Sequence, residues 1–140
     1  MLLDEIRQRW IDNDVPTKHP VIRFKGEGIS LDEIFQASRN VAFSIPSGSV
    51  VAHIGDFTPA DIAILLQLID HNCIIAPLTD ATSLQHEMFF ETIGAQWVIR
   101  GGEAFPRAVA QAEHPLITDL KNRQSPGLIL FSSGTTGTPK

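Results

Sequence analysis

Apolar residues at the start of the chain recur with spacings that predict a helix, a hairpin and a second helix. Residues 2–12 place their apolar side chains on one stripe of a helix, and residues 21–29 form two short apolar stretches around a glycine-containing turn. Ser30 and Glu33 have the spacing of a capping box, in which each side chain accepts a hydrogen bond from the other residue's backbone amide. A helix is therefore expected to begin directly after Ser30 and, from its apolar spacing, to continue to Ile45.

The next two segments have the composition of buried elements. Residues 50–54, VVAHI, predict the first core strand, and Thr58 and Pro59 suit the N-cap and the first turn of a helix over residues 59–70. This helix is apolar nearly all round, which indicates that more than one of its sides is buried.

The alternation of strand and helix then continues. Residues 73–78, CIIAPL, predict a fully buried strand, residues 83–93 predict a helix that stops at Gly94, and residues 96–99 predict another strand.

The last third of the chain has weaker patterns. Residues 103–112 have a weak helical spacing, and residues 116–118 are a short strand candidate. Residues 119–127 are predicted to form a polar loop, and residues 128–131 are the last predicted strand.

Strands separated by helices of this length predict an α/β fold with a mainly parallel sheet and helices on both faces. We expect one domain over residues 1–140, with a lead-in of helix, hairpin and helix over residues 1–48 and a βαβ core over residues 49–131. Ligands of such sheets bind at the carboxyl ends of the strands, which is where the terminal loop, residues 132–140, is expected to lie.

Composition and charge exclude several classes of protein. The formal net charge is −5, and the 11 Lys and Arg are scattered, so nucleic acid is not an expected partner. The N-terminus is acidic and the longest apolar run, residues 62–66, is too short for a membrane span, so neither secretion nor membrane insertion is expected. Cys73 is the only cysteine and is expected to be a buried thiol, which fits a reducing, cytoplasmic location.

The other candidate chemical groups have simpler explanations. The five histidines show no spacing typical of metal ligands. Asp56 and Asp61 are better explained as loop and helix-cap residues than as a catalytic pair. No residue of the chain is therefore assigned a catalytic role.

The end of the chain, residues 128–140 (LILFSSGTTGTPK), carries the clearest chemical signal. Composition alone leaves a simple turn open, but the loop combines backbone freedom at Gly134 and Gly137, a run of hydroxyl side chains and the charge of Lys140. These groups together favour phosphate binding. The common P-loop pattern of NTPases is excluded, because Gly137 stands three residues before Lys140 and not directly before it.

The loop resembles the signature of a known family. Residues 132–140, SSGTTGTPK, are similar position for position to the signature loop of the adenylate-forming superfamily, which includes acyl- and aryl-CoA ligases, peptide-synthetase adenylation domains and firefly-type luciferases. Residues 72–78, NCIIAPL, resemble the strand that follows the apolar helix in this family, with Asn72 in place of the usual glycine. The resemblance implies the N-terminal subdomain of an acyl-CoA synthetase-like fold.

The resemblance also implies a reaction and its site. These enzymes use ATP and a small-molecule carboxylic acid to form an acyl-adenylate and pyrophosphate, and usually a thioester with CoA or a carrier thiol afterwards. Thr135 would help place Mg²⁺, and Lys140 would neutralise charge on the leaving pyrophosphate. The residues expected to bind the ATP phosphates are Ser132, Ser133, Gly134, Thr135, Thr136, Gly137, Thr138 and Lys140.

The resemblance covers the N-terminal part of such an enzyme, so the 140-residue chain alone is expected to be inactive. An acyl- or aryl-CoA ligase is the first interpretation, and a peptide-synthetase adenylation domain is the second. A non-catalytic α/β module that binds a nucleotide or a partner is the alternative from another class. If a partner subdomain is missing, a second copy of the chain is expected to cover the strand at residues 128–131, giving a homodimer.

Overall fold

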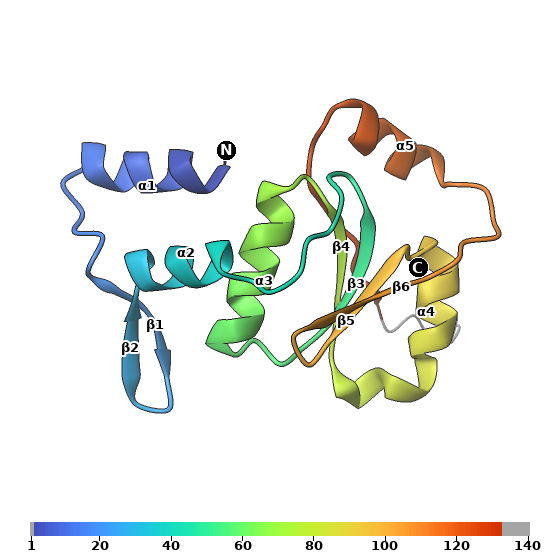
Figure 1. The fold of residues 1–140 in the computed structure, drawn as a ribbon, viewed down its shortest axis with the longest axis horizontal. Helices are drawn as coiled ribbons and strands as arrows, with labels where there is room; N and C mark the ends of the chain where they lie inside the picture. The colour runs from blue at the N-terminus through green and yellow to red at the C-terminus, as the bar shows by residue number, and fades with distance from the viewer. Residues whose placement is uncertain (1, 133–140) are drawn as a thin grey trace.

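A five-stranded sheet forms the centre of the computed structural model, which describes residues 2–132 (Figure 1). The strands lie in the order β6-β5-β3-β4-β7. Strands β5, β3, β4 and β7 are parallel to one another, and β6, at one edge, is antiparallel to β5. The bounds are Val50–Ile54 for β3, Ile74–Leu78 for β4, Trp97–Arg100 for β5, Glu103–Pro106 for β6 and Gly127–Leu128 for β7. The predicted, mainly parallel sheet is confirmed.

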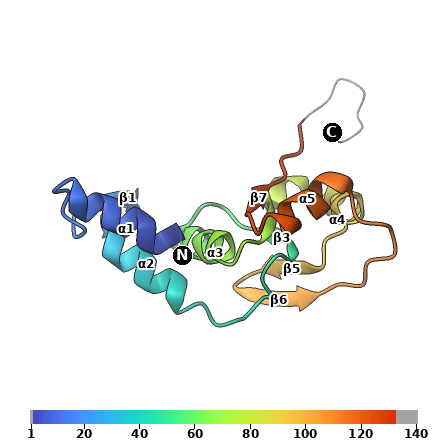
Figure 2. The same cartoon turned by 90° about the horizontal axis from the view of Figure 1, so that it is seen from above.

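Helices cover both faces of this sheet (Figure 2). Leu68 of α3 belongs to the same buried cluster as Val51 of β3, whereas Ala52 points to the opposite face because successive strand residues alternate. On that second face Ala52 lies in a cluster with Phe90 of α4 and Ile117 of α5. The bounds are Pro59–Asp70 for α3, Asp80–Gln85 for the 3₁₀ helix η1, His86–Ile93 for α4 and Pro115–Asn122 for α5. The prediction of helices on both faces is confirmed.

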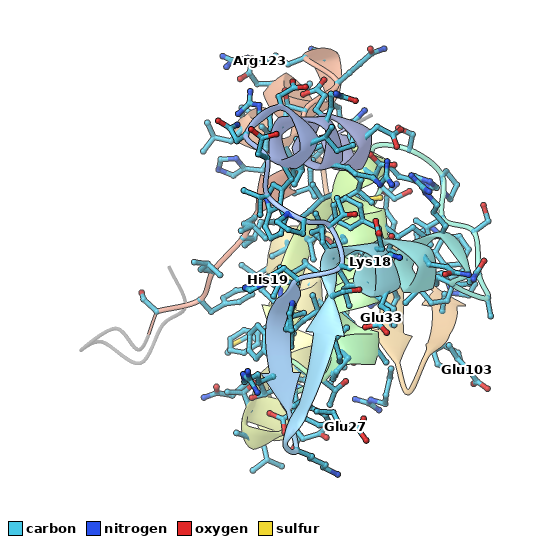
Figure 3. The ribbon with its side chains drawn as sticks, turned by 90° about the vertical axis from the view of Figure 1, so that its left-hand side faces the viewer. Lys18, His19, Glu27, Glu33, Glu103 and Arg123 are labelled. Carbon is cyan, nitrogen blue, oxygen red and sulfur yellow. The ribbon has the colours of Figure 1, made fainter. Side chains whose placement is uncertain are left out.

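The lead-in forms a third layer on the side of α3 away from the sheet (Figure 1). Its elements are α1 (Leu2–Asp12), β1 (Pro20–Phe24), β2 (Glu27–Ser30) and α2 (Leu31–Arg39). Ala63 of α3 is 3% exposed and packs with Leu3 of α1 and Phe35 of α2. Figure 3 looks onto this layer, with Glu27 and Glu33 labelled on the hairpin and on α2. Helix α3 is thus buried on two sides, as its apolar sequence predicts.

Three helix ends follow the local rules that the sequence predicts. Ser30 Oγ accepts a hydrogen bond from Glu33 N (3.1 Å), and Glu33 Oε2 accepts one from Ser30 N (2.8 Å), which completes the capping box. Thr58 Oγ1 accepts from Asp61 N at 3.2 Å and caps α3. Gly94 ends α4 in the left-handed conformation, with φ of 65°.

The predicted continuation of α2 to Ile45 is wrong. The helix ends at Arg39, and Asn40 caps it by donating its backbone N–H to carbonyls of the last turn. Residues 41–45 follow without regular structure. Ile45 is nevertheless only 3% exposed and packs in the core cluster between α3 and the sheet. Its apolar side chain is therefore explained by a buried loop and not by a longer helix.

The region after β5 also differs from the prediction. The weak helix expected over residues 103–112 is wrong. Residues 103–106 form the short strand β6, because Gly101 and Gly102 both have positive φ (59° and 77°) and turn the chain back against β5, and residues 107–112 have no regular structure. Residues 116–118, expected to form a strand, lie inside helix α5. The same helix includes residues 119–122, the start of the loop expected over residues 119–127. There His114 is the N-cap, with its side chain accepting from the N–H of the second helical residue.

Strand β7 is shorter than the predicted strand over residues 128–131. Ile129 N–H donates to Ile75 O at 2.8 Å, so the backbone N–H and C=O of Ile75 point toward β7. The backbone groups of every second residue of β4 point toward the same neighbour. The next such residue is Pro77, which has no N–H to donate. The ladder between β4 and β7 therefore ends early, and the chain leaves the sheet before it reaches the terminal loop.

The homodimer that the sequence predicts has an exposed apolar edge available to it. Leu128 is 60% exposed and Leu130 is 68% exposed on the open side of β7. We expect the 140-residue chain to self-associate as its concentration rises, and we expect Leu130→Lys to reduce this association. Light scattering across concentrations measures the mass, with Leu84→Lys, at a fully exposed leucine away from β7, as the control. A monomeric mass of the unsubstituted chain at every concentration would contradict the prediction.

Candidate functional site

A cavity of about 300 Å³ lies where β4 and β7 end at the carboxyl side of the sheet. Its walls come from the end of β4, from η1 and α4, and from residues 130–132. Four polar side chains border it, those of Thr79, Thr82, Gln85 and Ser132. In open α/β sheets this edge is where ligands bind, so this cavity is the candidate functional site.

The structure places one of the predicted phosphate-binding residues. Ser132 is exposed and borders the cavity beside the end of β4. The other predicted residues, Ser133, Gly134, Thr135, Thr136, Gly137, Thr138 and Lys140, lie outside the described residues. The start of the predicted phosphate loop is thus at the carboxyl edge of the sheet, as the sequence predicts.

Two inward-facing side chains hold the segment that leads to Ser132. Ile129 and Phe131 pack against the core on the side of α4 and α5, whereas Leu130 points outward. The Phe131 ring stacks on the Phe89 ring, with centroids 4.0 Å apart and ring planes 20° apart. This aromatic contact joins the exit of the sheet to helix α4.

A buried histidine ties the start of α4 to the end of β4. His86 is 3% exposed, and its Nε2 lies 2.9 Å from Thr79 O and 3.2 Å from Thr82 Oγ1. Because a carbonyl oxygen only accepts, Nε2 carries the proton in this contact. Nδ1 is buried without a hydrogen-bond partner among the described residues. The histidine thus holds Thr79 and Thr82, two residues that line the cavity.

A second polar pair lies beside the end of β3. His53 is 5% exposed, and its Nε2 is 3.5 Å from Asp61 Oδ1. Asp61 Oδ2 accepts hydrogen bonds from Asp56 N and from Thr58 Oγ1, each at 2.9 Å. A Cβ on Gly55 would lie 2.6 Å from the Asp61 carboxyl carbon, so only glycine fits there. Asp61 therefore organises the turn before α3, as the sequence predicts.

The pair has shifted pKa values. Burial lowers the pKa of His53 below its ordinary value, although the Asp61 carboxylate nearby opposes this effect. Burial raises the pKa of Asp61, but the hydrogen bonds from Asp56 and Thr58 outweigh it and leave the pKa below its ordinary value. His53 is accordingly neutral, and Asp61 is charged, near pH 7.

We expect these shifts to make the fold less stable in acid. Below pH 6.5, the ordinary pKa of histidine, the unfolded chain takes up a proton on His53 before the folded chain does, so stability falls. Asp61 adds a further loss as the pH drops below 3.8. Urea unfolding at a series of pH values measures the free energy of unfolding. In His53→Gln, this free energy is expected to fall less steeply as the pH drops below 6.5. Parallel curves for the two proteins would contradict the assignment to His53.

The described residues offer no resident metal centre. Within residues 2–132, no group of three His, Cys, Asp or Glu side chains is placed to hold a metal ion. Cys73 is buried, and burial raises the pKa of its thiol. None of the helices in this range has both the length and the apolar character needed to cross a bilayer.

Comparison with solved structures identifies a similar fold. The Klebsiella oxytoca NpsA N-terminal subdomain in space group P21 matches with a TM-score of 0.65 and 21% identity, over 99% of this chain and 38% of that chain. The likeness establishes the fold. The same subdomain in complex with 3-hydroxybenzoyl-AMSN and with 3-hydroxyanthranilyl-AMSN gives TM-scores of 0.64 and 0.63, at 21% and 22% identity and the same coverage. The chain thus spans 38% of the length of these structures.

No protein-family model and no curated protein matches the sequence.

Sequence reasoning missed most of the cavity wall. Thr79, Thr82 and Gln85 border the cavity, and none of them stands out by residue type or spacing. Phe89 lies in the helix predicted over residues 83–93, and it is both a core residue and part of the cavity wall. Their place in the sequence could have identified them, because Thr79, Thr82 and Gln85 lie within seven residues after the carboxyl end of a predicted core strand.

Proposed function

We propose that this chain is the N-terminal part of an ATP-dependent ligase that activates a carboxylic acid as its acyl-adenylate. The observation that carries the proposal is the position of Ser132. It begins a sequence that resembles the adenylate-forming signature, and it lies at the carboxyl edge of a parallel sheet, beside a cavity. The fold shared with the NpsA N-terminal subdomain supports the same proposal.

The proposed reaction assigns roles to the loop. A carboxylate oxygen of the substrate attacks the α-phosphorus of ATP, and the bond from that phosphorus to the bridging oxygen of pyrophosphate breaks. Amides and hydroxyls of the loop, including those of Thr135 and Thr136, hold the β- and γ-phosphates. Lys140 neutralises the charge that develops on pyrophosphate, and Thr135 helps to place Mg²⁺, which would supply further positive charge there.

We propose an aromatic carboxylic acid as the substrate class. Two solved structures of the similar fold hold 3-hydroxybenzoyl-AMSN and 3-hydroxyanthranilyl-AMSN, and both ligands carry an aromatic acyl group. The thiol that receives the acyl group is proposed to be CoA, and a carrier-bound thiol is the alternative.

ATP–pyrophosphate exchange by the protein as its gene encodes it tests the proposal. We expect exchange that depends on Mg²⁺ and on an added carboxylic acid, with hydroxybenzoates giving faster exchange than aliphatic acids of similar size. Adding CoA, or a carrier with its thiol, shows which acceptor consumes the adenylate. A folded protein that binds ATP but gives no exchange with any acid of the panel would overturn the ligase proposal and favour a non-catalytic nucleotide-binding module.

A further inference from the structure

The segment between the sheet and the phosphate loop depends on side-chain packing. Its backbone hydrogen bonds to β4 end with Ile129, because Pro77 has no N–H to continue the ladder. Two residues further on, Phe131 stacks on Phe89 at 4.0 Å. Phe131 directly precedes Ser132, so this stacked pair is the last described contact that fixes the direction of the chain before the loop begins.

The ring of Phe89 is itself held firmly. Its side chain is 5% exposed and belongs to the core cluster on the α4 side of the sheet. One turn earlier in α4, His86 bonds to Thr79 O at 2.9 Å and so joins the helix to the residue after β4. Phe89 therefore projects from a helix that is fixed to the same edge of the sheet that the loop leaves.

We propose that Phe89 is a positioning residue for the phosphate loop. Its ring holds Phe131 and thereby sets the point and direction from which Ser132 starts the loop. This inference rests on the proposed function, in which residues 132–140 bind the ATP phosphates. Without the ring, Phe131 and Ser132 lose the contact that sets their direction, and fixing that direction when ATP binds costs more conformational entropy. The effect falls on ATP and not on the carboxylic acid, because the loop binds only the phosphates.

The variant Phe89→Leu in the protein as its gene encodes it tests this role. We expect KM for ATP to rise about tenfold, while KM for the carboxylic acid stays within about twofold. Phe89→Tyr keeps the stacking ring and is expected to restore KM for ATP. Phe90→Leu is the matched control, because Phe90 is 6% exposed in the same helix and core cluster but does not stack on Phe131. It is expected to lower Tm as Phe89→Leu does and to leave KM for ATP unchanged.

The stacked pair also makes a prediction for its other member, Phe131. Phe131→Leu alone is expected to raise KM for ATP as Phe89→Leu does, and the double variant is expected to add little, because each single change already breaks the same contact. Fully additive effects would overturn the proposal. So would a Phe89→Leu protein that loses stability with no change in KM for ATP, or one in which both KM values rise equally.

Calorimetric titration of ATP·Mg separates this inference from the proposed function. If the unsubstituted protein binds ATP but gives no exchange, the ligase reaction is overturned, and a tenfold weaker Kd in Phe89→Leu than in Phe90→Leu still supports the positioning role. If ATP binds equally to both variants, the positioning role is overturned. If the unsubstituted protein does not bind ATP, both proposals are overturned.

Discussion

Replacing Lys140 with alanine is expected to lower carboxylate-dependent ATP–pyrophosphate exchange by about 10²- to 10³-fold. Lys140 carries the only formal charge in residues 132–140, SSGTTGTPK, and pyrophosphate leaves with several negative charges. A cation that meets charge developing in the transition state contributes more to kcat than to ground-state binding. The measurement is exchange under saturating ATP and acid with the protein as its gene encodes it.

Lys25→Ala is the matched control for this change. Lys25 lies in the turn of the N-terminal hairpin, where its ammonium group is 5.4 Å from the centre of the Phe24 ring, and it belongs to another layer of the fold. We expect its loss to leave exchange within about twofold, because a distant exposed charge is screened. Exchange by Lys140→Ala at the same level as Lys25→Ala would contradict the role of Lys140 in the loop.

Replacing Ile75 with alanine is expected to destabilise the 140-residue chain by about 3 to 4 kcal/mol. Ile75 is 0% exposed at the middle of β4 and packs under α3 in a cluster with Val51 and Leu68. Removing its larger side chain leaves a cavity that the strands on either side of β4 prevent from collapsing. A loss of this size is a large part of the total stability of an ordinary domain.

Urea unfolding followed by circular dichroism measures the change, with Ile75→Val as the graded comparison. Valine removes one methylene carbon and keeps the branched shape, so a loss of about 0.5 to 1.5 kcal/mol is expected. If alanine costs no more than valine, the packing of Ile75 between β4 and α3 is looser than the structure shows.

The parts of the fold that local chemistry determines were readable from the sequence. The capping box at Ser30 and Glu33 and the Thr58 N-cap each satisfy backbone amides within one helical turn, so no distant residue is needed to recognise them. Gly94 ends its helix for an equally local reason. The buried strands were readable because parallel sheets need continuous apolar runs.

Two of the errors fell where partners distant in the sequence decide the structure. Residues 103–106 are a different case, because their partner β5 is separated from them only by Gly101 and Gly102, and this two-glycine turn is a local hairpin signal. Residues 116–118 are helical because Ile117 packs into a core built from strands far away in the sequence. The early end of β7 depends on Pro77, whose missing N–H matters only once β4 and β7 are neighbours.

The candidate site was predictable only in part, for a similar reason. Residues 132–140 form one continuous signature, so the phosphate loop could be recognised without a structure. The cavity beside Ser132 is assembled from the end of β4, from η1 and α4, and from residues 130–132. No spacing in the sequence connects Phe89 with Phe131, yet their contact is what fixes the start of the loop.

The double-sided burial of α3 has a consequence for the newly made chain. Helices α1 and α2 are made before α3, whose surface around Ala63 they cover. Apolar side chains such as Leu3 and Phe35 therefore lack their packing against α3 until Asp70 at the end of that helix has been added. Until then α1 and α2 present an incompletely packed apolar surface, to which a chaperone can bind during synthesis.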